Sequence, residues 1–333
     1  MSDAWISRFI AEFYHYQGTP VIGQKINGCA GLDLREAARY PAAIMEMTYK
    51  AKLMDGSALA RRLLAHAKAK VGKIHQSTGV TPTLATLLVG DDRASATYVR
   101  MKRRRCEEAG MKSVRIDLPH GTSTEELVGE IKKLAMDESV HGILVQHPVP
   151  APIDKRAAFE AIPFEKDVDG VTSSTLGRVI LGMPAFASCT PKGIMQLLDE
   201  YQVGLDGSHA VVIGRSPILG RPMASLLINR HATVTLCHSR TRSLPSLVRH
   251  ADVVIAAVGK PRFVQGGWIK VGAVVIDAGY NAGTIGDVDF DSAIERCSLI
   301  TPVPGGVGPM TIATLIDQTA DAAAQQMGVQ GCG

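Results

Sequence analysis

The 333-residue sequence predicts an α/β fold that is divided into two domains. Short apolar runs, of the kind buried in parallel sheets, alternate with segments of helical periodicity in two successive series. The series meet near Thr190-Pro191, where threonine suits a helix N-cap and proline suits the first helical turn. A chain of this length buries two sizeable cores, and a hydrophobic content of 46% is ordinary for a globular protein.

The first series runs from residue 47 to residue 190. Its predicted elements are a helix at 54–76, a strand at 84–89, a helix at 94–108, a helix that starts after Ser123, and a strand at 142–145. Ser123 and Glu126 have the spacing of a capping box, which marks the start of the third helix. Strands that are joined by helices in this way favour right-handed crossovers and a layered α/β architecture.

The second series, residues 191–308, is followed by one last helix. Its predicted elements are a helix at 192–201 and strands at 209–213, 233–236, 252–256, 273–277 and 299–301, and the last helix spans 309–325. This succession predicts a doubly wound, Rossmann-type sheet, in which ligands bind at the carboxyl ends of the strands.

Residues 1–46 differ from the rest of the chain. Trp5, Phe9 and Phe13 recur every four residues, which is typical of an amphipathic helix, and turn-like stretches without periodicity follow. Two interpretations stay open. The segment is either a loosely attached, disordered extension, including upstream sequence read from a wrong start codon, or a helix that binds a partner. We expect the regular domains to start at Met47.

Composition argues against several classes of partner. A formal net charge of +4 is too small to indicate nucleic acid. The six cysteines are scattered without a CxxC pair, as in reduced cytosolic proteins, so we expect a cytoplasmic location. No apolar run reaches the roughly 18 residues of a membrane span, and a signal peptide is not recognisable. No HExxH motif or paired Cys/His spacing indicates a metal site.

A nucleotide site is predicted after the strand at 209–213. Gly214, Arg215, Ser216 and Gly220 follow that strand with the spacing Gly-x-Ser-x-x-x-Gly, at the start of a helix. A doubly wound sheet binds a pyrophosphate in this position, against backbone N–H groups. The spacing is not the common GxGxxG, so an ordinary strand–turn–helix connection is an equally good explanation of these residues alone.

The end of the next strand favours NADP over NAD. NAD enzymes usually have an acidic residue there for the ribose hydroxyl, but this chain has Ser239 and Arg240. Arg215 and Arg240 supply two cations, and arginine suits the geometry of a 2′-phosphate.

Three further segments are candidates for chemistry. Tyr98 and Lys102 share a helix face one turn apart, so a ring can stack on a flat heterocycle while an amine transfers a proton. Gln146 directly follows a buried strand, and Asp167 and Asp169 lie in one turn. Singly, these are also explained as a surface lysine, a strand end and an Asp-Gly turn.

Together, six motifs in order resemble the tetrahydrofolate dehydrogenase/cyclohydrolase family. They are YVxxK at 98–102, GILVQxP at 142–148, KDVDG at 166–170, TPxG at 190–193, GRSxxxGxP at 214–222 and PGGVGPMT at 304–311. The resemblance covers about residues 52 to 327. It implies an N-terminal α/β substrate domain and a Rossmann-type NADP-binding domain with a cleft between them. It also implies a last helix, 309–330, that packs back on the substrate domain, and a homodimer.

The implied activity is bifunctional. Methylene-tetrahydrofolate is oxidised to methenyl-tetrahydrofolate with NADP, which is then hydrolysed to formyl-tetrahydrofolate in the same cleft. No GxxxxGK[ST] loop is present, so an ATP-dependent ligase activity is not expected. Two alternatives remain: another two-domain NADP dehydrogenase of the shikimate type, and a folate-binding protein without catalysis.

The resemblance also implies roles for matching positions. Tyr98 would stack on the folate, Lys102 would be the acid–base group, Gln146 would hydrogen-bond Lys102, and Asp169 would bind the pterin edge. The implied NADP contacts are Gly214, Arg215, Ser216, Gly220, Ser239 and Arg240, and further substrate contacts are Gly305, Gly306 and Pro309.

Two features near Lys102 are not explained by the motifs. His147 departs from the apolar residue expected there, and either lines the cleft without chemistry or adds a titration near neutral pH. The arginines at 103–105 are predicted to form a solvated face, with contact to the glutamate tail of the folate as the alternative.

Overall fold

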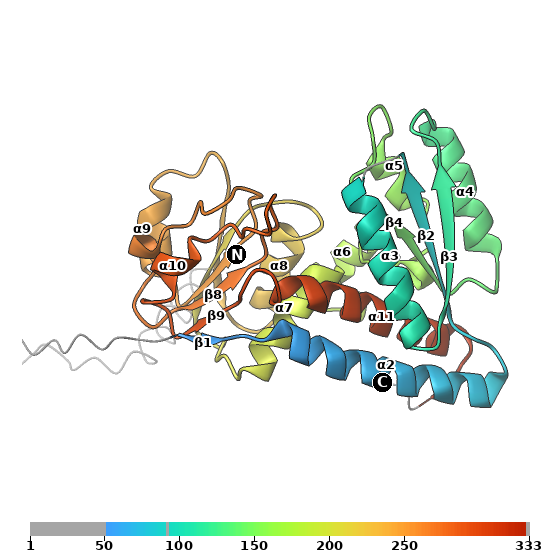
Figure 1. The fold of residues 1–333 in the computed structure, drawn as a ribbon, viewed down its shortest axis with the longest axis horizontal. Helices are drawn as coiled ribbons and strands as arrows, with labels where there is room; N and C mark the ends of the chain where they lie inside the picture. Colours follow the sequence, from blue (N-terminus) through green and yellow to red (C-terminus); the bar gives the residue numbers. More distant parts are fainter. Residues whose placement is uncertain (1–50, 91–92, 331–333) are drawn as a thin grey trace, which may run out of the picture. The chain divides into compact units, whose positions relative to one another are not determined.

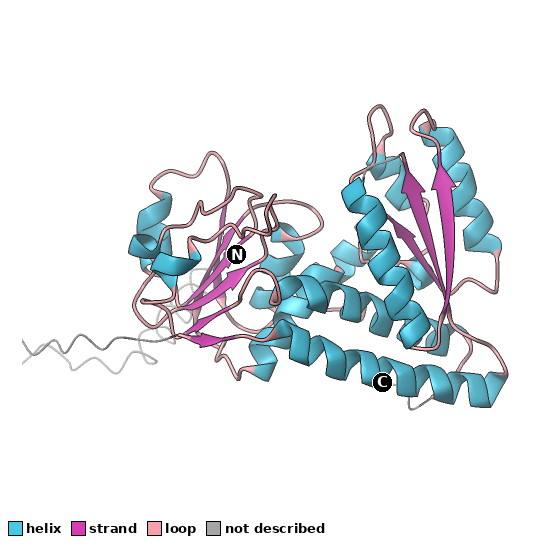
Figure 2. Ribbon diagram, in the orientation of Figure 1, coloured by secondary structure: helices cyan, strands magenta, loops and turns pink. Residues whose placement is uncertain are grey.

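The computed structural model describes residues 51–90 and 93–330, which form two parallel β-sheets with helices packed around them (Figures 1 and 2). One sheet has three strands in the order β3-β2-β4, and the other has six in the order β1-β9-β8-β7-β5-β6. The α/β fold expected from the alternating series is therefore confirmed. The predicted helix around Trp5 lies outside the described residues.

The three-stranded sheet is built around a fully buried central strand. β2 (Thr83–Val89) pairs in parallel with β3 (Lys112–Leu118) and with β4 (Gly142–Val145). Helix α3 (Arg93–Glu108) follows β2, and helix α4 (Thr124–Met136) follows β3. The capping box of α4 is confirmed, because Ser123 Oγ accepts from the Glu126 N–H at 3.1 Å and Glu126 Oε2 accepts from the Ser123 N–H at 2.8 Å.

The six-stranded sheet has the doubly wound arrangement. Its strands are β1 (Lys52–Leu53), β5 (His209–Ile213), β6 (Thr233–Cys237), β7 (Val253–Ala256), β8 (Val274–Asp277) and β9 (Leu299–Ile300). β6 pairs with one side of β5, and β7 pairs with the other side. The strand order therefore reverses between β5 and β7, and in such sheets the ligand site lies outside the carboxyl ends at this point.

Two long helices contribute to the cores under both sheets. α2 (Gly56–Thr78) and α11 (Val307–Gln326) pack against each other (Figure 1). Met310 of α11 belongs to the core that contains Val212 of β5, whereas Leu315 belongs to the core that contains Leu84 of β2. α7 (Cys189–Glu200) also packs on α11.

A buried ion pair joins these two helices. The Lys70 ammonium on α2 lies 2.8 Å from the Asp317 carboxylate and 2.6 Å from that of Asp321, both on α11. Burial lowers the pKa of Lys70, but hydrogen bonds to the two carboxylates outweigh it, so that the pKa is raised and the amine stays charged. Removing either helix would thus leave buried charge without a partner.

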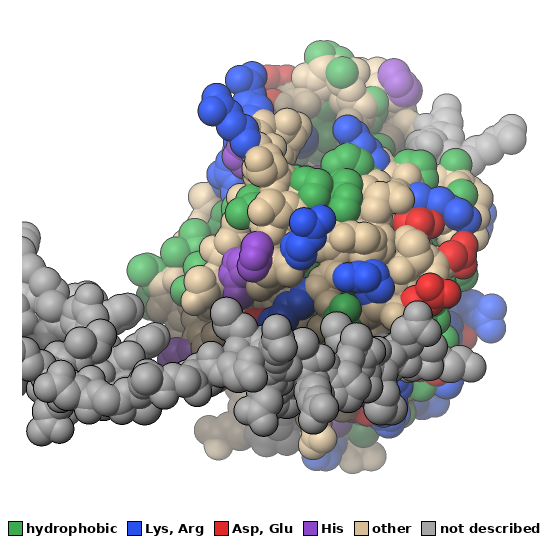
Figure 3. Space-filling view, turned by 90° about the vertical axis from the view of Figure 1, so that its left-hand side faces the viewer, with side chains coloured by type: hydrophobic (Ala, Val, Ile, Leu, Met, Phe, Trp, Pro, Cys, Tyr) green, Lys and Arg blue, Asp and Glu red, His purple; other side chains and the backbone are tan. Residues whose placement is uncertain are grey.

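The remaining elements are short. They are α5 (Lys155–Glu160), α6 (Ser173–Ile180), α8 (Gly220–Ile228), α9 (Leu244–Arg249), α10 (Phe290–Ala293) and the 3₁₀ turns η2 (Phe164–Lys166) and η3 (Gly266–Trp268). Among the described residues, no helix has the length and apolarity to cross a lipid bilayer. Figure 3 shows basic, acidic and apolar side chains interspersed on one face of the molecule.

Two helix starts differ from the sequence prediction. Thr190 is not the N-cap of α7, because the helix begins at Cys189 after Ser188. The Thr190 hydroxyl instead lies 3.0 Å from that of Thr311, at the start of α11. α11 begins at Val307, two residues before Pro309, which therefore lies inside its first turn.

Candidate active site

Lys102 and Gln146 come together from two different elements. Lys102 lies on α3, and Gln146 directly follows β4, held by its backbone N–H, which donates to Leu87 O of β2 at 2.9 Å. Lys102 Nζ donates to Gln146 Oε1 at 2.9 Å, and Gln146 Nε2 donates to His147 O at 2.6 Å. Only this orientation of the amide satisfies both contacts, because lysine has no acceptor and a carbonyl has no donor.

The turn after η2 supplies two carboxylates with different functions. Asp167 is fully buried, and its carboxylate accepts from the N–H groups of Val171 and Thr172 at 3.0 Å each and from the Thr175 hydroxyl at 2.6 Å. Asp167 therefore holds the start of α6. Asp169 is left to face Lys102, whose charge acts on it.

Lys166, in the same KDVDG segment, also has a structural role. Its ammonium donates to the carbonyl oxygens of Leu134, Ala135 and Asp137 at 3.2, 2.9 and 2.7 Å. These carbonyls lie at the carboxyl end of α4, where helix C=O groups lack partners within the helix. The KDVDG segment is thereby tied to the carboxyl end of α4.

Two residues that the sequence did not indicate support Asp169 from behind. Cys189, at the first position of α7, is buried, and its thiol donates to Val168 O at 3.3 Å, next to Asp169. Gln318 of α11 donates from Nε2 to Val168 O at 2.7 Å and lies 3.5 Å from the Cys189 sulfur. A cysteine at the start of a helix and a glutamine inside another have no recognisable sequence pattern, so the sequence did not predict either residue.

Burial shifts the pKa of both charged groups in this cluster. It lowers the pKa of Lys102, although the Asp169 charge acts in the opposite direction. It raises the pKa of Asp169, and Lys102 and the Cys189 thiol act against that rise. An amine with a lowered pKa spends more of its time neutral at physiological pH, which a base requires.

His147 does not titrate near neutrality. Its ring packs edge-on against Phe159, with centroids 4.7 Å apart. Burial, followed by the charges of Lys102 and Lys155, lowers the pKa of His147 to about 4. Of the two interpretations of His147, the titration near neutral pH is therefore wrong, and the one without chemistry remains.

The rest of α3 agrees with the sequence prediction as far as it is described. Arg103 and Arg104 are exposed and pair with Glu107 and Glu108, one turn further on, at 2.8 and 2.9 Å. The solvated face is thus confirmed. Tyr98 lies on α3 one turn before Lys102, but its side chain is outside the described part of the structure.

The turn after β5 is tight enough to require glycine at two positions. Gly214 has φ +126°, and a Cβ there would collide with the Ala257 carbonyl oxygen at the end of β7. A Cβ on Gly220 would collide with Gly214 O. Close approach of backbone at glycines between a strand and a helix start is typical of dinucleotide sites.

The two predicted cation-bearing turns lie next to each other. Gly214 N–H donates to Cys237 O at 2.9 Å, which joins the ends of β5 and β6. Arg215, Ser216, Ser239 and Arg240 are all exposed at this edge. Such a set of guanidinium and hydroxyl groups fits the phosphates of NADP.

The predicted glycine loop before α11 contacts the start of α2. Gly305 has φ +106°, and its carbonyl oxygen accepts from the Ser57 N–H at 2.9 Å. A Cβ on Gly56 would collide with Gly306 O, so the two backbones touch. Among the described residues, Lys102, Gln146 and Asp169 form one group beside the three-stranded sheet. The turns after β5 and β6 and the glycine loop before α11 lie at the edge of the six-stranded sheet.

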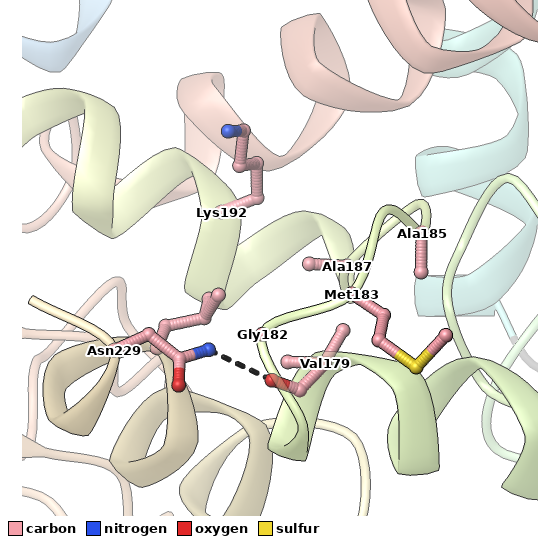
Figure 4. A pocket seen from close by; sticks show the side chains of 8 residues that line it. Val179, Gly182, Met183, Ala185, Ala187, Lys192 and Asn229 are labelled. Carbon is pink, nitrogen blue, oxygen red and sulfur yellow. Dashed lines mark hydrogen bonds between the residues drawn. The ribbon is translucent and has the colours of Figure 1, made fainter.

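A separate cavity of about 320 Å³ contains none of the predicted site residues. It lies between α6, α7 and α8, and its lining residues are Val179, Gly182, Met183, Ala185, Ala187, Lys192, Leu226 and Asn229. Figure 4 shows Asn229 Nδ2 donating to Val179 O, at 2.8 Å. No cluster of His, Cys, Asp and Glu in the described ranges is arranged to hold a metal ion.

Comparison with known proteins gives consistent matches. Residues 54–169 match the catalytic domain model of the tetrahydrofolate dehydrogenase/cyclohydrolase family, and residues 188–327 match its NAD(P)-binding domain model. The chain is 60% identical over 286 residues to bifunctional protein FolD 1 of Streptomyces avermitilis, covering 86% of this chain and 100% of that protein. It is 54% identical over 278 residues to bifunctional protein FolD of Saccharophagus degradans, covering 84% and 99%.

Solved structures agree with the sequence relatives. A bifunctional methylenetetrahydrofolate dehydrogenase/cyclohydrolase from Campylobacter jejuni superposes with a TM-score of 0.81 at 44% identity, covering 83% of this chain and 99% of that one. The enzyme of Trypanosoma brucei, solved with NADP and an inhibitor, has a TM-score of 0.80 at 36% identity, covering 84% and 99%. The chain therefore belongs to the tetrahydrofolate dehydrogenase/cyclohydrolase family.

Proposed function

We propose that the chain oxidises methylene-tetrahydrofolate to methenyl-tetrahydrofolate with NADP and hydrolyses the product at the same site, with Lys102 as the proton-transfer group. The observation that carries this proposal is the Lys102 amine, held 2.9 Å from Gln146 Oε1 and close to Asp169. Because the chain belongs to the tetrahydrofolate dehydrogenase/cyclohydrolase family, the substrate on which this amine acts is a tetrahydrofolate derivative.

In the first reaction the residues mainly position the reactants. NADP, when bound, accepts the hydride that leaves the methylene carbon. Asp169 binds N–H donors of the pterin, and Tyr98 supplies a ring for stacking. Arg215, Ser239 and Arg240 hold the cofactor by its 2′-phosphate, and the close turn at Gly214 lets backbone N–H groups approach the pyrophosphate.

In the second reaction Lys102 removes a proton from the attacking water. The methenyl product carries a positive charge, and a second positive charge beside it is unfavourable, so binding lowers the pKa of Lys102 below its already reduced value. Gln146 Oε1 accepts one hydrogen of the Lys102 amine. This bond orients the amine, so that the side of the nitrogen that takes the proton is directed toward the substrate. General base catalysis of this kind contributes roughly 10²- to 10⁴-fold in rate.

Two spectrophotometric assays on the purified full chain test this function. The first follows cofactor reduction with methylene-tetrahydrofolate and NADP, and the second follows loss of the methenyl absorbance without cofactor. Activity in both supports the proposal. Folate binding with neither activity would indicate a non-catalytic folate-binding protein, and cofactor reduction by hydroxy acids alone would indicate a shikimate-type dehydrogenase.

The organisation of the protein is part of the proposal. We assign residues 47–190 to the folate domain, 191–308 to the NADP domain and 309–330 to a helix of the folate domain, with 1–46 as an extension. Two parts cross this division, because β1 is a strand of the six-stranded sheet and Met310 of α11 belongs to the core of that sheet. The family models, which match 54–169 and 188–327, support the central boundary. A cytoplasmic homodimer is expected from the family resemblance, and light scattering of the purified chain tests the dimer.

A further inference from the structure

A buried carboxylate outside the predicted site organises the cofactor edge of the six-stranded sheet. Asp287 is fully buried, in the loop that follows β8. Oδ2 accepts from the N–H groups of Val258 at 2.5 Å and Gly259 at 2.8 Å, and Oδ1 accepts from the Lys260 N–H at 2.9 Å and from Asn281 Nδ2 at 3.0 Å. Four N–H donors, and not a positively charged side chain, thus compensate the buried Asp287 carboxylate.

The residues held by Asp287 lie at the switch point of the sheet. Ala257 directly follows β7 and is followed by the three residues 258–260. The Ala257 N–H donates to Ile213 O, at the end of β5, at 2.8 Å. The Ala257 carbonyl oxygen is the atom that excludes a side chain from Gly214. The loop after β7 and the Gly214 turn therefore define each other's position.

The packing around Asp287 leaves it little freedom to move. Its backbone N–H donates to Asp277 Oδ1 at 2.9 Å. A Cβ on Gly279 would collide with the Asp287 carboxyl group, and one on Gly286 would collide with Asp277 Oδ2. The chain thus uses glycine at two positions to admit a second, neighbouring carboxylate and to fix the loop.

We propose that Asp287 is a positioning residue for NADP, which fixes residues 257–260 against the Gly214 turn and so shapes the cofactor site. The Asp287 carboxylate accepts from the N–H groups of residues 258–260, so these N–H groups are not available to the cofactor. The loop therefore contacts the cofactor through its shape and its carbonyl groups. The inference rests on the proposed function, because it requires NADP to bind at this edge.

The test measures NADP binding by calorimetry and methenyl hydrolysis without cofactor, on the same preparations. Asp287→Asn replaces one acceptor oxygen with a donor that faces N–H groups. We expect NADP affinity to fall roughly ten- to a hundredfold, as for loss of one or two hydrogen bonds to a charge. Hydrolysis without NADP should stay within about twofold of the unsubstituted protein.

Two further variants make the outcome decisive. Asn281→Leu removes one donor at a partly exposed position, and we expect a smaller loss of NADP affinity in the same direction. Asp289→Asn is the matched control, because its carboxylate contacts Ser292 and Arg262 and none of the residues 257–260 that Asp287 fixes. It should leave NADP affinity unchanged. If Asp287→Asn does not fold, Asn281→Leu decides.

Unchanged NADP affinity in folded Asp287→Asn, or in Asn281→Leu when the first variant is unfolded, would overturn the inference. Equal losses of NADP binding and of hydrolysis would also overturn it, because they would show a general structural role. An unsubstituted chain that hydrolyses methenyl-tetrahydrofolate but does not bind NADP would contradict the proposed dehydrogenase function, and with it the premise of the inference.

Discussion

Replacing Lys102 with methionine should separate the two reactions. Methionine keeps a flexible, unbranched stem but removes the amine that donates to Gln146 Oε1 at 2.9 Å. Hydrolysis needs a proton acceptor at the attacking water, so its rate should fall roughly 10²- to 10⁴-fold. The hydride step depends on geometry, and should lose far less.

The structure also predicts the side effects of this substitution. Gln146 is 8% exposed, so its freed Oε1 becomes a buried acceptor without its donor, which costs about 1–3 kcal/mol of stability. The pKa of Asp169, which the Lys102 charge holds down, should rise further. Asp169 accepts from N–H donors as the carboxylate, so folate affinity in the variant should weaken as pH falls, and this weakening should begin at a higher pH than in the parent protein.

Both rates are measured on one preparation, by cofactor reduction and by loss of methenyl absorbance. Lys102→Arg keeps the charge but cannot release its proton, so it should hydrolyse as slowly as Lys102→Met. Arg103→Met is the matched control on the exposed face of α3. Unchanged hydrolysis in Lys102→Met would refute the reasoning, and equal loss of both rates with folate still bound would make Lys102 a shared positioning group.

Three more substitutions test other parts of the molecule. Arg215→Ala should weaken NADP use far more than NAD use, because only NADP carries the 2′-phosphate, and equal KM changes for both cofactors would contradict this. Cys189→Val removes the thiol that donates to Val168 O and holds down the pKa of Asp169, so that pKa should rise and KM for folate should increase more than kcat falls, whereas Cys189→Ser should stay close to the parent. Burial raises the pKa of Asp277 from 3.8 to about 6, so its ionisation costs stability as pH rises from about 4 to about 6. A shift of about two pKa units is worth about 3 kcal/mol. The test compares the free energy of unfolding of the parent and of Asp277→Asn, measured with urea at pH 4 and at pH 7. Between these two pH values, the parent should lose about 3 kcal/mol of stability relative to the variant.

The sequence predicted those elements whose residues are patterned by burial or capping. β2 and β4 are buried throughout and mainly apolar, and Ser123 with Glu126 marks the start of α4. β3 was missed because it lies at the sheet edge and alternates between exposed and half-buried residues. β1 was missed because two exposed residues carry no pattern, and it joins the sheet only by pairing with β9, far along the chain.

The candidate site shows the same limit. Motifs located Lys102, Gln146 and Asp169, but spacing alone does not distinguish Asp167, which holds α6, from Asp169, which faces the lysine. The support from Gln318 depends on a contact across 150 residues of sequence, from Gln318 to Val168. Local patterns contain no information about such a contact.

The shared helices α2 and α11 have a consequence for folding. Met54, just before α2, belongs to the same core as Val212, and Ala67 of α2 belongs to the same core as Leu84. A fragment cut near residue 190 would therefore expose apolar surface that the other half normally covers. We therefore expect that neither half folds on its own and that heat melts both sheets in one cooperative transition. Damage to the core beneath one ligand should then lower the population that can bind the other.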